Sequence, residues 1–199
     1  MRKRLLGTAI RRLERAGPQA LQARSLTASV GTSPQAIYTY FGGMPGLVEA
    51  IGDEGFIRLD AHAAAVHQTD DPVADFFSQG WAYSHWAHVH PQLYRLMFGV
   101  TGGALRVHDA VAGVMTSSVE RMQATGRIAP IDPVIVAAQF LSATHGFILL
   151  SLAGGFDRRS DGLAVIGALA VNLVVGLGDE RAAAERSLAA AAAARATAR

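Results

Sequence analysis

Amide and hydroxyl side chains gather in a short stretch near the N-terminus, where residues 31–41 read GTSPQAIYTYF. We expect a helix from Pro34 to about Tyr40, with the apolar side chains of Ile37 and Phe41 on its inner face. The outer face then carries amide, hydroxyl and phenol groups, which hydrogen-bond to base edges and phosphates in the major groove of DNA. The residues that we expect to contact DNA are Thr32, Ser33, Pro34, Gln35, Tyr38, Thr39 and Tyr40.

A second short helix precedes this one and completes a helix-turn-helix. Residues 23–30 can form two helical turns with Leu26 and Val30 on one face. Gly31 tolerates the positive φ that a sharp turn out of a helix requires. The hydroxyl of Ser33 can accept hydrogen bonds from the free amides of the next helix, and the following proline suits its first turn. The alternative is an ordinary helical hairpin whose aromatic residues only pack.

This stretch resembles the recognition-helix signature of the TetR family of dimeric transcriptional repressors. The signature reads G-V-S, three variable residues, apolar-Tyr-x-His-Phe, then lysine and an apolar residue. The residues that match it are Gly31, Ser33, Ile37, Tyr38, Phe41 and Leu47. Tyr40 replaces the usual histidine, Thr27 a small apolar residue, and Met44 the lysine that normally contacts a phosphate. The resemblance also implies a phosphate or base contact for Arg24, for which a solvated surface charge is the alternative.

Charge is distributed unevenly along the chain. The net charge is +2, but residues 1–50 carry +5 and the remaining residues −3. A basic N-terminal part and a mildly acidic remainder suit a chain that touches phosphate at one end only. The absence of cysteine excludes disulfides and thiolate metal sites.

Membrane insertion and secretion are not expected. Arginines interrupt the N-terminal stretch, so it lacks the apolar run of a signal peptide. The longest apolar segment, Leu163 to Leu177, contains Asn172 and is shorter than the roughly 18 residues that a membrane span needs. We therefore predict a cytoplasmic protein.

The expected architecture is all-α. Residues 1–45 form a three-helix DNA-binding domain, residues 46–178 an all-helical effector-binding and dimerisation domain, and residues 179–199 an alanine-rich tail. The tail is either a marginal helix or a flexible segment. The helices that we expect after the DNA-binding domain cover about residues 45–66, 71–90, 91–98, 104–125, 133–152 and 160–177.

A second resemblance lies in the expected effector domain. The segment HPQLYRLMFG, residues 90–99, is similar to a box of one TetR subgroup whose ligand domain is named for a Trp-His-Gly triplet. Thr144, His145 and Gly146 stand at the place of that triplet, so the tryptophan is missing. The two resemblances together span about residues 5–177, and they imply an apolar effector cavity between helices.

Aromatic and methionine side chains are concentrated in the middle of this domain. Such side chains at helical spacing also form ordinary cores, and that alternative stays open. A wide cavity with few polar groups would suit a small lipophilic effector. The residues that we expect around it are Trp81, Trp86, Tyr94, Met97, Phe98, Met115, Met122 and Phe140.

Two apolar seams recur at spacings of three and four residues. Such seams suit a four-helix bundle formed by two chains, and a two-fold protein matches a palindromic operator. The alternative is that both seams pack into their own core. The seam residues are Val134, Ala138, Leu141, His145, Ile148 and Leu152 in the first, and Leu163, Ile166, Ala170, Leu173 and Leu177 in the second.

No catalytic constellation or metal site is predicted. His85 and His88 are one helical turn apart, but no carboxylate shares their local face, so neutral imidazoles are expected. The sequence contains no G-x-S-x-G, H-E-x-x-H or P-loop motif, and no cofactor is expected.

The predicted function is a dimeric, sequence-specific transcriptional repressor, with an activator as a variant. The alternative class is a helical small-molecule carrier or enzyme with a vestigial DNA-binding head.

Overall fold

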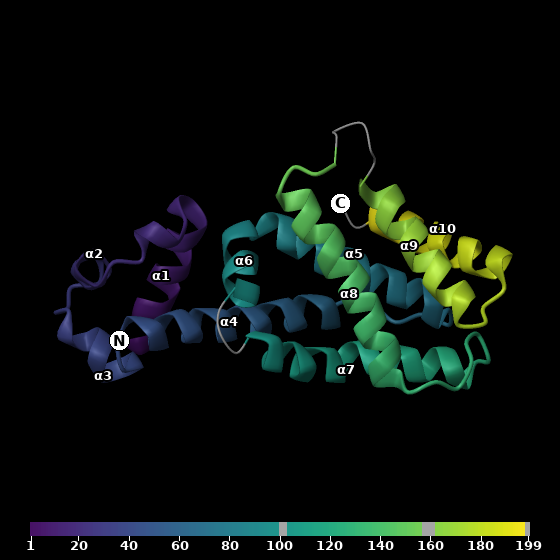
Figure 1. Ribbon diagram of the computed structural model, residues 1–199, viewed down its shortest axis with the longest axis horizontal. Helices are drawn as coiled ribbons and strands as arrows, with labels where there is room; N and C mark the ends of the chain where they lie inside the picture. Colours follow the sequence, from purple (N-terminus) through teal and green to yellow (C-terminus); the bar gives the residue numbers. More distant parts are fainter. Residues whose placement is uncertain (100–102, 157–161, 198–199) are drawn as a thin grey trace. The chain divides into compact units, whose positions relative to one another are not determined.

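The computed structural model describes residues 1–99, 103–156 and 162–197, and all the regular structure in these ranges is helical (Figure 1). The predicted all-α class is therefore confirmed. The helices are α1 (Arg2–Ala16), η1 (Pro18–Ala20), α2 (Ala23–Ser29), α3 (Gln35–Phe41), α4 (Met44–Ala64), α5 (Pro72–Val89), α6 (Pro91–Gly99), α7 (Gly103–Ala124), α8 (Pro133–Leu152), α9 (Gly162–Gly176) and α10 (Arg181–Thr197).

The helix ends that we predicted from proline and glycine positions agree with most of the observed ends to within one or two residues. The alanine-rich C-terminal segment, for which two alternatives were open, forms α10. The expected start of α9 at residue 160 lies outside the described residues.

The chain divides into two compact units. Unit 1 comprises Met1–Leu59 and Val89–Val107, and unit 2 comprises Asp60–His88 and His108–Arg199. These units differ from the expected linear division at residue 45, because the segment that carries α6 belongs to unit 1. The alanine-rich C-terminus belongs to unit 2 and forms no separate part.

In unit 1, α1 is the central helix of the N-terminal three-helix head. Its apolar stripe is buried, including Leu5, Ile10 and Leu13. The other face is basic, but Arg12 is not simply solvated, because its guanidinium donates a hydrogen bond of 2.8 Å to the hydroxyl of Ser25 on α2. This bond links the first two helices of the head.

The box at residues 90–99 forms α6, which packs inside unit 1. Tyr94 and Met97 are fully buried, and the Phe98 ring lies 5.5 Å from that of Phe56 on α4. The carboxylate of Glu14 on α1 accepts a hydrogen bond of 3.1 Å from the amide of Leu93. The box therefore holds α6 against α1 and α4.

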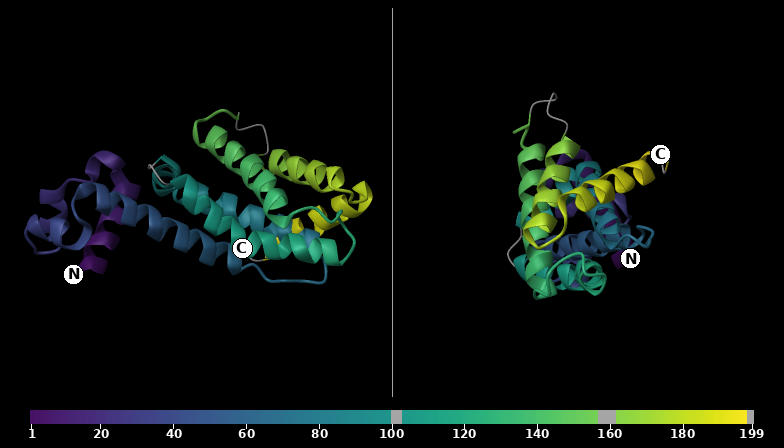
Figure 2. Two further views of the ribbon diagram at one scale, coloured as in Figure 1. Left: turned by 60° about the horizontal axis from the view of Figure 1, so that its bottom comes forward. Right: turned by 90° about the vertical axis from the view of Figure 1, so that its right-hand side faces the viewer.

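Unit 2 is a bundle in which α8 and α9 lie side by side and α10 packs on α9 (Figure 2). Rings from α5 and α8 meet in its core, where Phe76 and Phe140 form an edge-to-face pair with centroids 4.3 Å apart. Both side chains are almost completely buried. Burial of apolar area of this kind is the main stabilising contribution in a helical bundle.

A polar cluster joins the start of α5 to α10. Arg127 forms two hydrogen bonds of 2.8 Å with Asp179 and one of 3.2 Å with Asp71. Asp71 caps α5 through the amides of the next residues, and the hydroxyl of Ser187 donates to it at 2.6 Å. Partial burial raises the pKa of Asp71, but these hydrogen bonds and the charge of Arg127 lower it overall.

One helix in the described ranges, α8, is long and apolar enough to cross a membrane by length and composition. It is longer than the apolar segment considered from the sequence. Its inner face carries core residues such as Phe140 and Ile148, while four large apolar side chains on its outer face are exposed.

Candidate functional site

The turn between α2 and α3 has the geometry that its sequence predicts. Gly31 has a φ of 69°, a region that side chains with a β-carbon rarely adopt. The amides of Gly31 and Thr32 bond to carbonyls of α2, those of Ala28 and Thr27 respectively. A β-carbon at Gly31 would meet nothing within 4 Å, so glycine is needed for its backbone conformation and not for space.

The outer face of α3 is open to solvent. Tyr38 is 63% exposed and Tyr40 42% exposed, while the inner residue Ile37 is fully buried. The hydroxyl of Thr39 donates to the backbone carbonyl of Gln35, and the side chain of Gln35 is exposed. The expected DNA-contacting residues that are exposed are Arg24, Ser33, Pro34, Gln35, Tyr38, Thr39 and Tyr40, and Thr32 is half-buried.

Ser33 does not have the capping role that its position suggested. Helix α3 begins at Gln35, and no side-chain bond caps its N-terminus. Pro34 already has helical dihedral angles, and the carbonyl of Ser33 accepts the amide of Ala36 instead. The serine hydroxyl consequently stays on the surface, where it is available to an external partner.

Thr27 departs from the small apolar residue of the family signature, yet it is buried. Its hydroxyl donates to the carbonyls of Ala23 and Arg24, at 2.8 and 3.2 Å. These two acceptors satisfy the polar atom inside α2, so the substitution costs little.

The junction from α3 to α4 depends on a close backbone approach. A β-carbon at Gly46 would lie on the carbonyl of Phe41, and Gly42 and Gly43 both have positive φ. Only glycine at position 46 lets the first turn of α4 come so near to the end of α3. This contact fixes the angle at which α3 is presented.

A cation lies beside this junction although the expected lysine is missing. The guanidinium of Arg2 stacks over the ring of Phe41, 5.2 Å from its centroid. Met44, which replaces the lysine, is three residues further along the chain and half-buried. Arg2 therefore brings positive charge from the start of α1 to the end of α3, a contact that sequence reasoning missed because the two residues are far apart in the chain.

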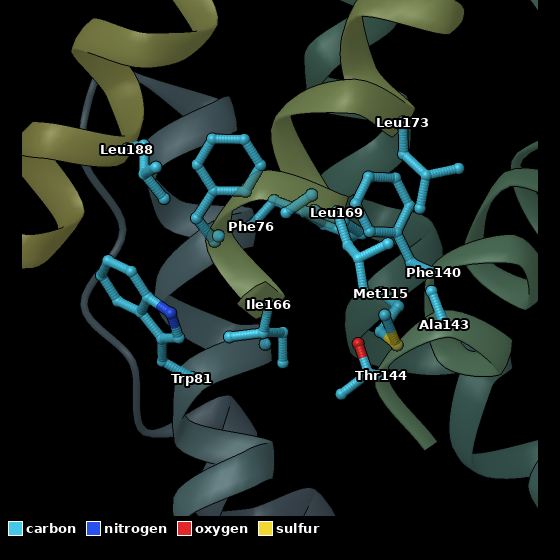
Figure 3. A pocket seen from close by; sticks show the side chains of 14 residues that line it. Phe76, Trp81, Met115, Phe140, Ala143, Thr144, Ile166, Leu169, Leu173 and Leu188 are labelled. Atoms are coloured by element: carbon cyan, nitrogen blue, oxygen red, sulfur yellow. The ribbon is translucent and has the colours of Figure 1, made fainter. Parts of the chain in front are cut away.

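Unit 2 contains an apolar cavity between five of its helices (Figure 3). Its volume is about 30 Å³, enough for water-sized molecules. The lining residues are Phe76, Phe77, Gly80, Trp81, Met115, Phe140, Ala143, Thr144, Ile166, Gly167, Leu169, Ala170, Leu173 and Leu188.

The residues that we expected around an effector lie in three different places in the structure. Trp81, Met115 and Phe140 line the cavity. Trp86 and Met122 are buried in unit 2 outside its lining. The remaining three residues, Tyr94, Met97 and Phe98, pack within unit 1.

The second apolar seam that we expected at a dimer interface lies on α9, where it forms part of the cavity wall. Ile166, Ala170 and Leu173 line the cavity, and Leu177 is buried in unit 2. The side chain of Leu163 lies outside the part of the chain that the structure describes. Apolar periodicity located the inner face of α9, but it could not distinguish a partner chain from a cavity.

The first seam is divided between core and surface. Leu141 and Ile148 are buried within unit 2, and His145 and Leu152 are half-buried. Val134 and Ala138 are exposed. The exposed large apolar side chains of α8 are Val134, Ile135, Leu149 and Leu150, and Leu169 is the corresponding one on α9.

Histidines in unit 2 have structural partners. Nδ1 of His88 donates to the carbonyl of Ser84 at 2.7 Å, so Nε2 of the neutral ring accepts from the hydroxyl of Ser151 at 2.8 Å. Burial lowers the pKa of His145. Among the described residues, no group of three or more histidine, aspartate or glutamate side chains is arranged to hold a metal ion.

Two family models match the sequence. Residues 5–51 match the model described as bacterial regulatory proteins, tetR family, and residues 76–173 match a tetracyclin repressor-like C-terminal domain. The first match covers the helix-turn-helix, and the second covers most of the cavity wall. No curated protein sequence matches the chain.

Solved structures share the fold across nearly the whole chain. A protein with unknown function from Rhodococcus sp. RHA1 is 27% identical, with a TM-score of 0.77, over 89% of this chain and 95% of that one. A tetR-family regulatory protein from Rhodococcus RHA1 is 20% identical, with a TM-score of 0.62, over 90% and 97%. RolR in complex with resorcinol is 14% identical, with a TM-score of 0.71, over 94% and 92%.

Proposed function

The chain belongs to the TetR family of transcriptional regulators, and we propose that it acts as a dimeric, sequence-specific DNA-binding repressor in the cytoplasm. The observation that carries this proposal is the outer face of α3. It presents amide, hydroxyl and phenol groups to solvent on a helix held in place by the buried Ile37, the half-buried Phe41 and a glycine turn. Such groups read base edges in the major groove and hold nearby phosphates.

We assign the missing phosphate anchor to Arg2. Its guanidinium is held on the Phe41 ring at the end of α3, next to the position where Met44 lacks a charge. A phosphate contact there contributes affinity that depends on salt but not on sequence, because it releases counterions from the DNA. The net charge of +5 in residues 1–50 supports the same role for this end of the chain.

The exposed face of α8 is the surface that we propose for dimerisation. Its large apolar side chains lie at both ends of the helix, and the small residues Ala138 and Ser142 lie between them. Small residues in the middle of an apolar face allow two helices to approach closely. This surface replaces the seam expected from periodicity, because part of that seam is buried in the chain itself.

Sedimentation of two charge-introducing variants tests the dimer. Leu150 is 57% exposed on α8, and Ile57 is 63% exposed on α4 in unit 1. We expect Leu150→Glu to give monomers, because it places charge in a desolvated interface, while Ile57→Glu sediments as the wild type does. Two variants that both remain dimeric would contradict the proposed surface.

A small apolar effector is proposed to bind unit 2 and release the DNA. RolR, a structural neighbour, is described in complex with resorcinol, and here the cavity of unit 2 offers a mostly apolar site. The effector must bind the DNA-free state more tightly than the DNA-bound state, since only differential affinity shifts the equilibrium. The proposed activity is binding, without catalysis.

Selection from a pool of random DNA duplexes tests the DNA-reading function. We expect the purified protein to enrich a palindrome whose half-sites lie about 10 base pairs apart on one face of the duplex. Enrichment of no motif at physiological salt would favour the alternative, a helical carrier or enzyme whose head is vestigial. The departure at Met44 is the feature that keeps this alternative in view.

A further inference from the structure

We propose that the cavity of unit 2 binds a neutral, single-ring aromatic molecule that carries a phenolic hydroxyl. The inference rests on the proposed function of unit 2 as an effector domain, and it names the chemistry of the effector. Three properties of the cavity carry it: the nature of its walls, two polar atoms that face it, and its small size.

The walls favour an uncharged aromatic ring. Phe76, Trp81 and Phe140 contribute rings from α5 and α8, and Met115 contributes a thioether (Figure 3). Rings and thioethers bind an aromatic ligand edge-to-face or in offset stacks. No charged side chain belongs to the described lining, so a carboxylate or ammonium ligand would lose its hydration there. The guanidinium of Arg195 lies beside the lining and stacks over the ring of Trp81, 5.2 Å from its centroid.

Two polar atoms of the lining are available to hydrogen-bond a ligand. The hydroxyl of Thr144 and the indole N–H of Trp81 belong to side chains that are 9% and 8% exposed. Within the ranges that the structure describes, neither atom has a hydrogen-bond partner. In Figure 3 the indole nitrogen of Trp81 faces Ile166, and Thr144 lies on the opposite side of Ile166. A phenolic oxygen can accept from the indole, and its hydrogen can be donated to the threonine oxygen.

The size of the cavity favours one ring over larger molecules. A cavity of about 150 Å³ is known to hold benzene, whereas this one measures about 30 Å³. Even a single ring must therefore displace part of the wall, and longer molecules must displace more. At Gly80 the cavity is open, because a β-carbon there would meet nothing within 4 Å. At Gly167 it is closed by the side chain of Leu188 from α10. Movement of the single side chain Leu188 would enlarge the cavity.

Calorimetric titration of the wild-type protein with matched small molecules tests the class of ligand. Phenol and resorcinol are expected to bind more tightly than toluene, benzoate and decanoate. Toluene has the ring without the hydroxyl, benzoate adds a charge, and decanoate is a long chain. Tighter binding of toluene, benzoate or decanoate than of phenol would overturn the proposal, and so would binding of none of them.

Thr144→Val tests the hydrogen bond, because valine keeps the shape of threonine and removes its hydroxyl. We expect the affinity for phenol to fall about fivefold, the effect of one neutral hydrogen bond, while the affinity for toluene is unchanged or rises. Equal losses for phenol and toluene would indicate that the substitution only disturbed packing, and the assigned role of the hydroxyl would be wrong.

Gly80→Leu tests the location by filling the open side of the cavity. Gly113 provides a control, since it also lies within a helix and leaves a β-carbon with nothing within 4 Å. Gly113 is exposed, whereas Gly80 is half-buried. Neither leucine meets an existing atom at its β-carbon, and both replace a glycine that disfavours the helix, so both variants should fold. We expect Gly80→Leu to abolish phenol binding and Gly113→Leu to retain it. Wild-type binding by Gly80→Leu would place the ligand elsewhere.

The experiments distinguish a wrong ligand assignment from a wrong proposed function. Sequence-specific DNA binding without phenol binding would overturn the ligand assignment and leave the regulator intact. Phenol binding at the cavity without any DNA recognition would support the ligand assignment and overturn the proposed regulator in favour of a carrier.

Discussion

The head of unit 1 and the cavity of unit 2 present their side chains in opposite ways. On α3 the proposed DNA-reading groups are exposed, and a separate set of buried residues such as Ile37 holds the helix. In the cavity, Trp81 and Phe140 both face the proposed ligand and form the core of the unit. Recognition and stability are therefore carried by different residues in the head and by the same residues in the cavity.

This difference determines what a substitution can reveal. Removal of an exposed group on α3 changes binding and leaves folding nearly unchanged, because few intramolecular contacts are lost. Removal of a cavity wall creates a void and destabilises the unit before any ligand is considered. Four substitutions test this comparison, in decreasing order of expected effect.

The largest effect is expected from Phe140→Ala in the cavity wall. Phe140 is 4% exposed and packs edge-to-face on Phe76, so its removal should lower the free energy of unfolding by about 3–5 kcal/mol. Urea denaturation followed by circular dichroism measures the change. A loss below about 1 kcal/mol would contradict the view that the cavity wall is also core.

The double substitution Gln35→Ala with Tyr38→Ala in the head comes next. Loss of two base or phosphate contacts should weaken operator binding about 100-fold, equivalent to about 2.7 kcal/mol, with the melting temperature unchanged. Fluorescence anisotropy with a labelled operator gives the affinity. The control is Gln68→Ala, an exposed glutamine of unit 2, which should bind as the wild type does. An unaltered affinity in the double variant would remove α3 from the interface.

Arg2→Ala should have a smaller effect of a different kind. We expect operator affinity to fall about tenfold for all sequences alike, and the slope of log affinity against log salt to become shallower by about 0.9 per lost phosphate contact. Adding Met44→Lys should restore both values, since it returns the cation to the same junction. Arg186→Ala in unit 2, where the side chain is 72% exposed, is the charge-matched control. A loss that Met44→Lys does not restore would make Arg2 a packing residue only.

The smallest effect concerns the polar cluster at the start of α5. The folded state lowers the pKa of Asp71, so its contribution to stability is present above the pKa of the unfolded chain and is lost as pH falls through the folded pKa. Asp71→Asn keeps the cap but removes the charge. The variant should lose up to about 1 kcal/mol at pH 7 and should lose less than the wild type on acidification.

Melting temperatures between pH 7 and pH 3 measure this effect, and Asp70→Asn at the neighbouring exposed position is the control. Parallel pH profiles of the wild type and Asp71→Asn would show that the cluster contributes no pH-dependent stability.

The sequence predicted the head well because the information there is local. Gly31, the buried anchor Ile37 and the polar positions between them act within a few residues, so a short motif determines their geometry. The exception was Ser33, whose expected cap is absent because Pro34 already has helical dihedral angles and the carbonyl of Ser33 accepts the amide of Ala36. The contact between Arg2 and Phe41 was missed because it joins residues far apart in the chain.

Unit 2 was predicted less completely, for a physical reason. Helical periodicity shows that a face is apolar but not what covers it, so Leu173 was assigned to a dimer seam although it lines the cavity. Tyr94 and Met97 were assigned to the effector site for their chemistry, yet they pack in unit 1. Leu188 stands out in the alanine-rich segment as a large apolar side chain, but it was not assigned to the effector site, because its role depends on where α10 folds back.

The central claim is that the chain reads operator DNA through its N-terminal head. Footprinting of the purified protein on the DNA upstream of its own gene, across a salt series, tests it most directly. We predict a protected palindrome with half-sites about one helical turn apart and an affinity that falls steeply with salt. No protection at low salt, or uniform protection without a preferred site, would contradict the claim.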